Sequence, residues 1–158
     1  MEKEFLFVGI TGHRNYKDRP NIRNWMQGIA KKHGKQTTII TGGAIGADII
    51  TAEEVIRAGL RSIIILPMPF AIFTDRWNEK QKARLNAVLS SSKVKIACPK
   101  HEYNPHAYME RNAQIVEDSD ILLAFWSGIT SGGTFDTIQK AINKERTVYN
   151  GITREQIW

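Results

Sequence analysis

The chain has 158 residues, 42% of them hydrophobic, which is enough to bury a core and too apolar for a disordered chain, so we expect one domain over residues 1–158. The net charge of +6 favours anionic partners without choosing among nucleotides, nucleic acid and acidic protein surfaces. A single cysteine excludes an intrachain disulfide, and the first apolar run is too short for a signal peptide or a membrane span, so we expect a cytoplasmic protein with no membrane partner.

Short apolar runs alternate with helical patterns along the whole chain. A buried strand is predicted at 5–10, and the next helix has its apolar face at Ile22, Trp25, Met26, Ile29 and Ala30 and ends before Gly34. The pattern then predicts, in order, a strand at 37–41, a helix at 48–59, a strand at 61–69, a helix at about 75–89, a strand at 93–98, a helix at 106–119, a strand at 121–126, a helix at 133–144 and a final strand at 146–151. Because each parallel connection needs a crossover, we expect an α/β fold, a Rossmann-like three-layer sandwich with a mainly parallel sheet of five to six strands.

Ligands of open parallel sheets bind beyond the carboxyl ends of the strands. The segments predicted to lie there are 11–16, 41–48, 67–70 and 127–134, most of them rich in Gly, Thr and Ser. In the last segment, Ser131, Gly132, Gly133 and Thr134 open a helix, and they either present N–H and O–H donors to a phosphate or only cap the helix and make the turn.

The other turns raise similar alternatives. Gly42, Gly43 and Gly46 lack the full G-x-G-x-x-G fingerprint, so the turn suits the close approach of a ligand better than it suits NAD. Asp48 either caps the helix that follows or binds ribose hydroxyls. Thr11, Gly12, His13 and Arg14 follow the first strand, nearest the expected topological switch, where Arg14 either binds a phosphate in a bidentate manner or is solvated.

Later residues complete the candidate ligand site. Asn112 falls on the apolar side of its helix, and with Arg111 it either recognises a base or a pyrophosphate or only bridges helix and loop. Trp126, at a strand end, is the preferred candidate for stacking on a base, whereas Phe70, Trp77 and Tyr108 fit core packing better. Cys98, His101 and His106 fall short of a structural zinc pattern, so we expect no metal and no cofactor.

The motifs "ITGHR", "GGAIGAD", "RNAQIVEDSDILLAFW" and "SGGTFDTI", in this order over residues 5–149, resemble the SLOG superfamily, most closely its YpsA-like and DprA/Smf-like branches. The resemblance implies a Rossmann-like nucleotide-binding domain. Its relatives include phosphoribohydrolases, single-strand DNA-binding recombination mediators and sensors of nucleotide-derived signals. The phosphoribohydrolase pattern G-G-x-G-T-x-x-E is not matched, because Thr137 stands where its glutamate is expected and Asp136 is the only nearby carboxylate.

We therefore expect a protein that binds a nucleotide or nucleotide-derived small molecule, such as an ADP-ribose-type or cyclic nucleotide signal, as a sensor or sequestering protein, with phage–host conflict as one setting. The alternative is a hydrolase of a nucleotide N-glycosidic bond, with Asp48, Glu110 or Asp136 supplying the carboxylate. Single-strand nucleic-acid binding ranks third, because the chain lacks interleaved aromatic and basic residues. Related domains often pair, so a homo-oligomer is expected.

Overall fold

The computed structural model describes residues 6–158, and residue 5 of the first predicted strand lies outside this range. The strands are β1 (Phe7–Gly12), β2 (Thr38–Thr41), β3 (Arg61–Leu66), β4 (Lys93–Ile96), β5 (Ile121–Phe125) and β6 (Thr147–Asn150). The helices are α1 (Arg19–His33), α2 (Ala47–Arg57), α3 (Phe70–Phe73), α4 (Glu79–Leu89), α5 (His106–Asp118) and α6 (Gly132–Asn143). The predicted alternation of strands and helices is confirmed.

The strands form one 6-stranded sheet in the order β4-β3-β2-β1-β5-β6. Each neighbouring pair is parallel, as the Val8–Ile39 and Val8–Ile121 partners on either side of β1 illustrate. The chain builds the sheet outward from β1 to β4 and then returns to the other side of β1 with β5. The strand order therefore reverses between β1 and β5, and a crevice is expected at their carboxyl ends.

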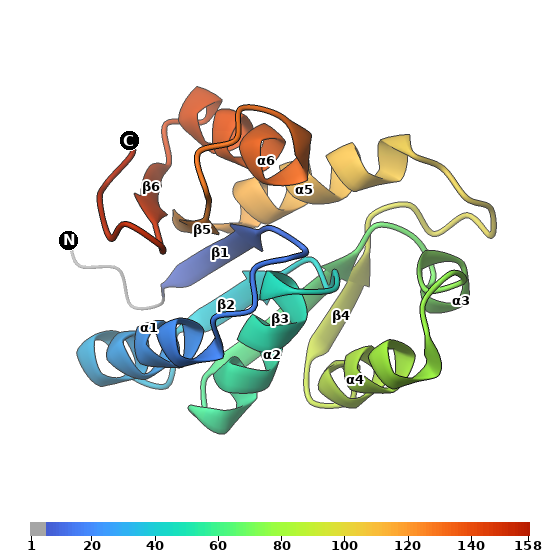
Figure 1. The fold of residues 1–158 in the computed structure, drawn as a ribbon, viewed down its shortest axis with the longest axis horizontal. Coiled ribbons are helices and arrows are strands. Elements are labelled where there is room, and N and C mark those ends of the chain that lie inside the picture. The colour runs from blue at the N-terminus through green and yellow to red at the C-terminus, as the bar shows by residue number, and fades with distance from the viewer. Residues whose placement is uncertain (1–5) are drawn as a thin grey trace.

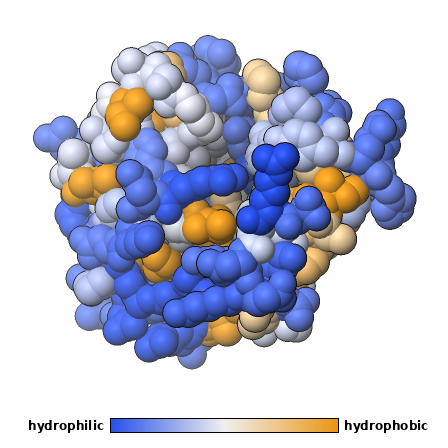
Figure 2. Space-filling view, turned by 45° about the vertical axis from the view of Figure 1, so that its right-hand side comes forward, coloured by the Kyte–Doolittle hydropathy of each residue, from blue (hydrophilic) through white to orange (hydrophobic). Residues whose placement is uncertain are grey.

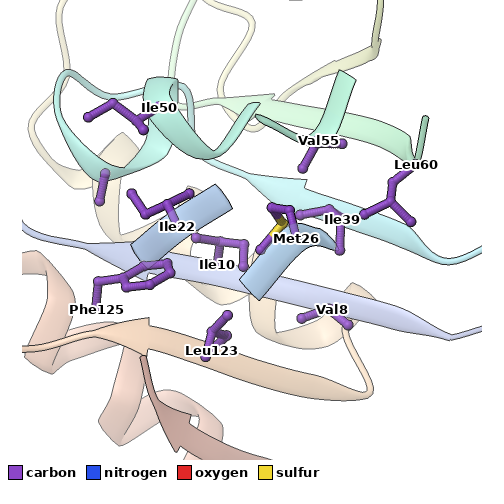
Figure 3. Close-up of a cluster of buried hydrophobic side chains, with 11 residues drawn as sticks. Val8, Ile10, Ile22, Met26, Ile39, Ile50, Val55, Leu60, Leu123 and Phe125 are labelled. Atoms are coloured by element: carbon purple, nitrogen blue, oxygen red, sulfur yellow. The ribbon is translucent and has the colours of Figure 1, made fainter. Parts of the chain in front are cut away.

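Helices cover both faces of the sheet, which confirms the expected three-layer sandwich (Figure 1). Helices α1, α2 and α4 lie on one face, and α5 and α6 lie on the other. On the first face, Ile22 and Met26 of α1 are fully buried against Ile10 of β1 (Figure 3). On the second face, Ile115 of α5 and Ile138 of α6 pack in a separate core cluster. Along β5, Leu123 and Phe125 belong to the first core cluster and Leu122 and Ala124 to the second, as the period of 2 requires.

Local signals explain where the helices begin and end. Asp18 accepts a hydrogen bond from the Asn21 N–H at the start of α1, and the helix ends at Gly34 as predicted. The helix predicted from about residue 75 instead begins at Glu79, because Asn78 caps it and accepts from the Gln81 N–H. Residues 70–73 form the separate short helix α3.

The surface is mainly hydrophilic on the face shown in Figure 2, where hydrophobic side chains are scattered in small groups. Single exposed apolar side chains are normal for a folded domain. Within residues 6–158, no helix has the length and apolar character needed to cross a membrane.

Candidate functional site

A cleft of about 400 Å³ opens at the carboxyl end of β1, beside the point where the strand order reverses. Its walls come from β1 and the loop after it, the loop and first turn of α2, one side of α5 and the start of α6. The lining residues are Ile10, Thr11, Gly12, His13, Arg14, Ala44, Asp48, Tyr108, Arg111, Asn112, Ile115, Gly133 and Thr134.

Most of the residues predicted for a ligand site line this cleft. The structure brings together Thr11, Gly12, His13, Arg14, Asp48, Arg111, Asn112, Gly133 and Thr134. The remaining predicted residues, Gly42, Gly43, Gly46, Trp126, Ser131 and Gly132, do not line it. Segments that are far apart in the sequence therefore meet at one edge of the sheet.

Gly42 and Gly46 shape the wall of the cleft without lining it. A Cβ atom on Gly42 would lie 2.7 Å from Cζ of Arg111 and 2.9 Å from Oδ2 of Asp48, so the absent side chain makes room for both charged groups. Gly46 has a φ of 92° and passes so close to the backbone of Arg14 that a Cβ atom would overlap it. Both positions require glycine, one for space and one also for its backbone conformation.

Arg111 is a buried cation at the cleft, only 7% exposed. Its Nε donates to Oδ1 of Asn112 at 3.0 Å, and its Nη1 donates to the Gly42 carbonyl at 2.5 Å. The guanidinium lies 5.8 Å from the centre of the Tyr108 ring. Burial lowers the pKa of Arg111, and the nearby Asp48 carboxylate opposes this effect. Within residues 6–158, Nη2 makes no hydrogen bond, so one edge of this group is free for a ligand.

Asp48 is a buried carboxyl group in the same cleft, also 7% exposed. It lies in the first turn of α2, whose N-cap is Gly46, and its Oδ2 accepts from the Ala44 N–H at 3.2 Å. It therefore fastens the turn before the helix and does not occupy the cap position. Burial raises the pKa of Asp48 more strongly than Arg111 and the Ala44 N–H lower it.

The amino terminus of α6 is open at the cleft. Ser131 occupies the N-cap position, but its side chain accepts no hydrogen bond from the first turn. Ser131, Gly132 and Gly133 are exposed. The first N–H groups of a helix have no partner within the helix and favour an anion. The alternative in which Ser131 only caps the helix is not supported by its contacts.

His13 and Arg14 lie in the loop after β1. The Ser127 N–H donates to Nε2 of His13 at 3.0 Å, which ties the loop after β1 to the loop after β5. Arg14 is exposed, and its side chain makes no hydrogen bond or ion pair within residues 6–158. The cleft therefore has one buried and one exposed arginine.

The candidate catalytic carboxylates have different surroundings. Asp136 accepts from Nδ2 of Asn112 at 3.2 Å and pairs with Lys140 at 2.7 Å. Glu110 is exposed, does not line the cleft, and accepts from Sγ of Cys98. Of the three candidates, only Asp48 lines the cleft. In the described part of the chain, no group of three His, Cys, Asp or Glu residues is arranged to hold a metal.

The aromatic residues differ from the expected stacking arrangement. The Trp126 ring stacks on Phe135 with ring centres 6.2 Å apart, and its Nε1 donates to the Ile129 carbonyl at 2.8 Å. Tyr108 lines the cleft instead. The sequence had favoured core packing for Tyr108; its position one helical turn before Asn112 was the signal that could have placed it on the ligand side.

A second hollow of about 490 Å³ lies between α1 and the amino-terminal halves of β1 and β5. It is lined mainly by apolar side chains such as Val8, Trp25 and Leu123. It lies at the other end of the strands from the glycine turns, and no helix amino terminus reaches it. We therefore take the cleft at the carboxyl edge as the candidate site.

Comparisons with known proteins show one matching family and several solved structures with a similar fold. The family model described as DNA recombination-mediator protein A matches residues 2–156. Among solved structures, DNA processing protein A (DprA) from Streptococcus pneumoniae has a TM-score of 0.74 at 16% identity, covering 93% of this chain and 50% of that one. DNA processing protein A from Helicobacter pylori has a TM-score of 0.73 at 17% identity, covering 94% and 70%.

A further structural neighbour comes from another group of proteins. The molybdenum cofactor binding protein from Rippkaea orientalis has a TM-score of 0.64 at 18% identity, covering 94% of this chain and 77% of that one. At these identities the neighbours establish the fold. The chain spans half the length of the Streptococcus pneumoniae protein. No curated protein matches it.

Proposed function

Because this chain belongs to the DNA recombination-mediator protein A family, which confirms its expected place in the SLOG superfamily, we propose that its cleft binds a nucleotide or nucleotide-derived small molecule through its phosphate. The protein holds this ligand intact, as a sensor or a sequestering protein does. The Rippkaea orientalis neighbour, a molybdenum cofactor binding protein, supports a small-molecule role for this fold. The cleft volume of about 400 Å³ lies in the usual range of small-molecule sites.

One observation carries the proposal: a buried arginine with a free donor edge and the uncapped amino terminus of α6 line the same cleft. Arg111 offers Nη2, and the first turn of α6 offers backbone N–H groups beside Gly133. Charge-assisted hydrogen bonds to phosphate are roughly twice as strong as neutral ones. Arg14 adds an exposed cation that attracts the anion as it approaches.

Asp48 fits the sugar part of such a ligand. Its Oδ2 is held by the Ala44 N–H, and the carboxyl group lines the cleft, so it has lone pairs left for ribose hydroxyls. Burial raises the pKa of Asp48, and the Arg111 guanidinium and the Ala44 N–H oppose this rise. We propose that Asp48 contacts the ribose and that the start of α6 contacts the phosphate.

The contacts of Asp136 and Thr137 do not favour a catalytic role for either residue. Both oxygens of Asp136 are engaged, one by Asn112 and the other by Lys140. Thr137, which stands in place of the glutamate of the phosphoribohydrolase pattern, donates its hydroxyl to the Gly133 carbonyl at 2.8 Å. Neither group is free to act as a general base on a ligand in the cleft.

Titration calorimetry with AMP, ADP-ribose, cyclic AMP and inorganic phosphate tests this function. We expect at least one nucleotide to bind and to be recovered intact by chromatography. Arg14→Ala should weaken its affinity roughly tenfold, because one charge-assisted contact is lost. Arg76→Ala is the matched control, since it removes the same charge from an exposed position outside the cleft. Equal losses in the two variants, or no binding by the wild type, would contradict the proposal.

Single-stranded DNA binding is the second candidate, favoured by the family match and by the net charge of +6. The Helicobacter pylori neighbour is a DNA processing protein A described with a single-stranded DNA binding mode. Fluorescence anisotropy with an oligothymidylate should then show an affinity that falls steeply between about 50 and 200 mM salt. Nucleotide binding without oligonucleotide binding would reject this candidate.

A further inference from the structure

We infer that Asp136 is a positioning residue: through the amide of Asn112, it holds the guanidinium of Arg111 in the orientation that binds the phosphate of the ligand. The inference rests on the proposed function for its effect on binding. It assigns to Asp136 a role other than the catalytic one considered from the sequence. Asp136 does not line the cleft, so it acts through its neighbours.

The contacts form a chain from α6 through α5 to the loop after β2. Lys140 pairs with Oδ1 of Asp136 at 2.7 Å, and Oδ2 of Asp136 accepts from Nδ2 of Asn112 at 3.2 Å. Oδ1 of Asn112 then accepts from Nε of Arg111 at 3.0 Å, and Nη1 of Arg111 donates to the Gly42 carbonyl. Arg111 and Asn112 are each 7% exposed, so this part of the chain of contacts is screened little by water.

The donor and acceptor properties of these groups fix the direction of every bond. An ionised carboxylate only accepts and a guanidinium only donates. The Asn112 amide must therefore turn its NH₂ group to Asp136 and its oxygen to Arg111. A neutral amide at position 136 could still accept from Nδ2 of Asn112, but without a negative charge, so the bond that holds the Asn112 amide would be weaker.

The consequence for Arg111 is that two of its three nitrogen groups are held in place before a ligand arrives. Only Nη2 makes no hydrogen bond within residues 6–158. A planar donor group that is already oriented loses less conformational entropy when it binds an anion. Asp136 therefore contributes to affinity by reducing the cost of ordering Arg111.

The sign of the effect separates this role from a purely electrostatic one. Asp136 carries a negative charge near an anion site, so by Coulomb attraction and repulsion alone its removal should strengthen phosphate binding. Loss of a positioning contact should weaken binding. A catalytic carboxylate would instead change turnover and leave ligand affinity nearly unaltered.

The test measures the binding of AMP and inorganic phosphate to Asp136→Asn, Arg111→Gln and the double variant. We expect Asp136→Asn to weaken binding roughly three- to tenfold, because a charge-assisted hydrogen bond to Asn112 becomes a neutral one, and to have no further effect when Arg111 is already replaced. Glu145→Gln is the matched control, because it removes the same charge from an exposed position outside the cleft and the chain of contacts; it should bind nearly as the wild type does. Unchanged or tighter binding by Asp136→Asn, or additive losses, would overturn the inference.

A second readout needs no ligand. The Nε–H of Arg111, observed by ¹⁵N NMR, should exchange slowly with solvent in the wild type and in Glu145→Gln, and faster in Asp136→Asn and Asp136→Ala. Faster exchange in a protein that binds no phosphate would reject the proposed function and retain the positioning of Arg111 by Asp136. Unchanged exchange in both Asp136 variants, with their thermal unfolding unaltered, would reject the positioning role whatever the ligand result.

Discussion

Replacing Gly42 with alanine tests the geometry of the cleft most directly. The new Cβ atom would lie 2.7 Å from Cζ of Arg111 and 2.9 Å from Oδ2 of Asp48, distances that the folded state cannot accept without a shift. Arg111 is 7% exposed and donates to the carbonyl of the same Gly42, so it cannot move away into water and keep this bond.

The cost follows from two effects. Overpacking of a filled site costs about 1–3 kcal/mol, and loss of a hydrogen bond from a charged group costs about 1.5–3 kcal/mol. Gly42 does not have a positive φ, so alanine also gains about 0.4–1 kcal/mol by restricting the unfolded chain. We expect Gly42→Ala to lower the free energy of unfolding by about 2–5 kcal/mol.

Urea unfolding followed by circular dichroism measures this change, and titration calorimetry should show that the variant has also lost nucleotide affinity. Gly28→Ala is the matched control: Gly28 lies in α1, and a Cβ atom there would meet nothing within 4 Å. It should stabilise the protein by up to about 1 kcal/mol through helix propensity. If Gly42→Ala is as stable as the wild type, the placement of Arg111 and Asp48 beside Gly42 is wrong.

Three further predictions concern stability. Glu54 is 1% exposed, and burial raises its pKa, but hydrogen bonds from Arg23 and Arg19 outweigh this effect and lower the pKa overall. Glu54→Gln should therefore destabilise the protein by about 1–3 kcal/mol at neutral pH. That difference in unfolding free energy, measured in urea, should shrink as the pH falls below the ordinary glutamate range and through the folded-state pKa. Burial raises the pKa of Asp48, so the free energy of unfolding of the wild type relative to that of Asp48→Asn should decrease as the pH rises from the ordinary aspartate range through the folded-state pKa. A difference between their urea midpoints that does not change with pH would contradict the raised pKa. Gly46→Ala combines a φ of 92° with overlap on the Arg14 backbone and should lower the thermal midpoint by at least about 4 °C, which differential scanning calorimetry measures.

Sequence periodicity predicted the order of strands and helices because each element buries its own apolar face. The face of α1 containing Ile22 and Met26 repeats at helical spacing, and both residues are buried in the structure. The start of α4 was missed by several residues, because residues 70–73 form a separate short helix and Asn78 caps α4. The short stretch between these two helices carries too little apolar pattern to show where the second one begins.

The location of the candidate cleft was also predictable from the sequence. Parallel strands end at one edge of a sheet, so the residues after β1, β2 and β5 had to lie near each other once the α/β fold was predicted. This rule predicted that Arg14, Asp48 and Thr134 lie near one another, and the structure places all three at the same cleft. It did not say which members of each turn would line that cleft.

Only the tertiary structure decided the partners of the buried polar groups. Asn112 and Asp136 are 24 positions apart, and Arg111 and Gly42 are 69 apart, so no local pattern links them. Their contacts depend on how α5 and α6 pack side by side on the sheet (Figure 1). Periodicity records which side of an element is apolar, whereas hydrogen bonds between elements depend on distances of a few ångströms that arise only when the elements pack together.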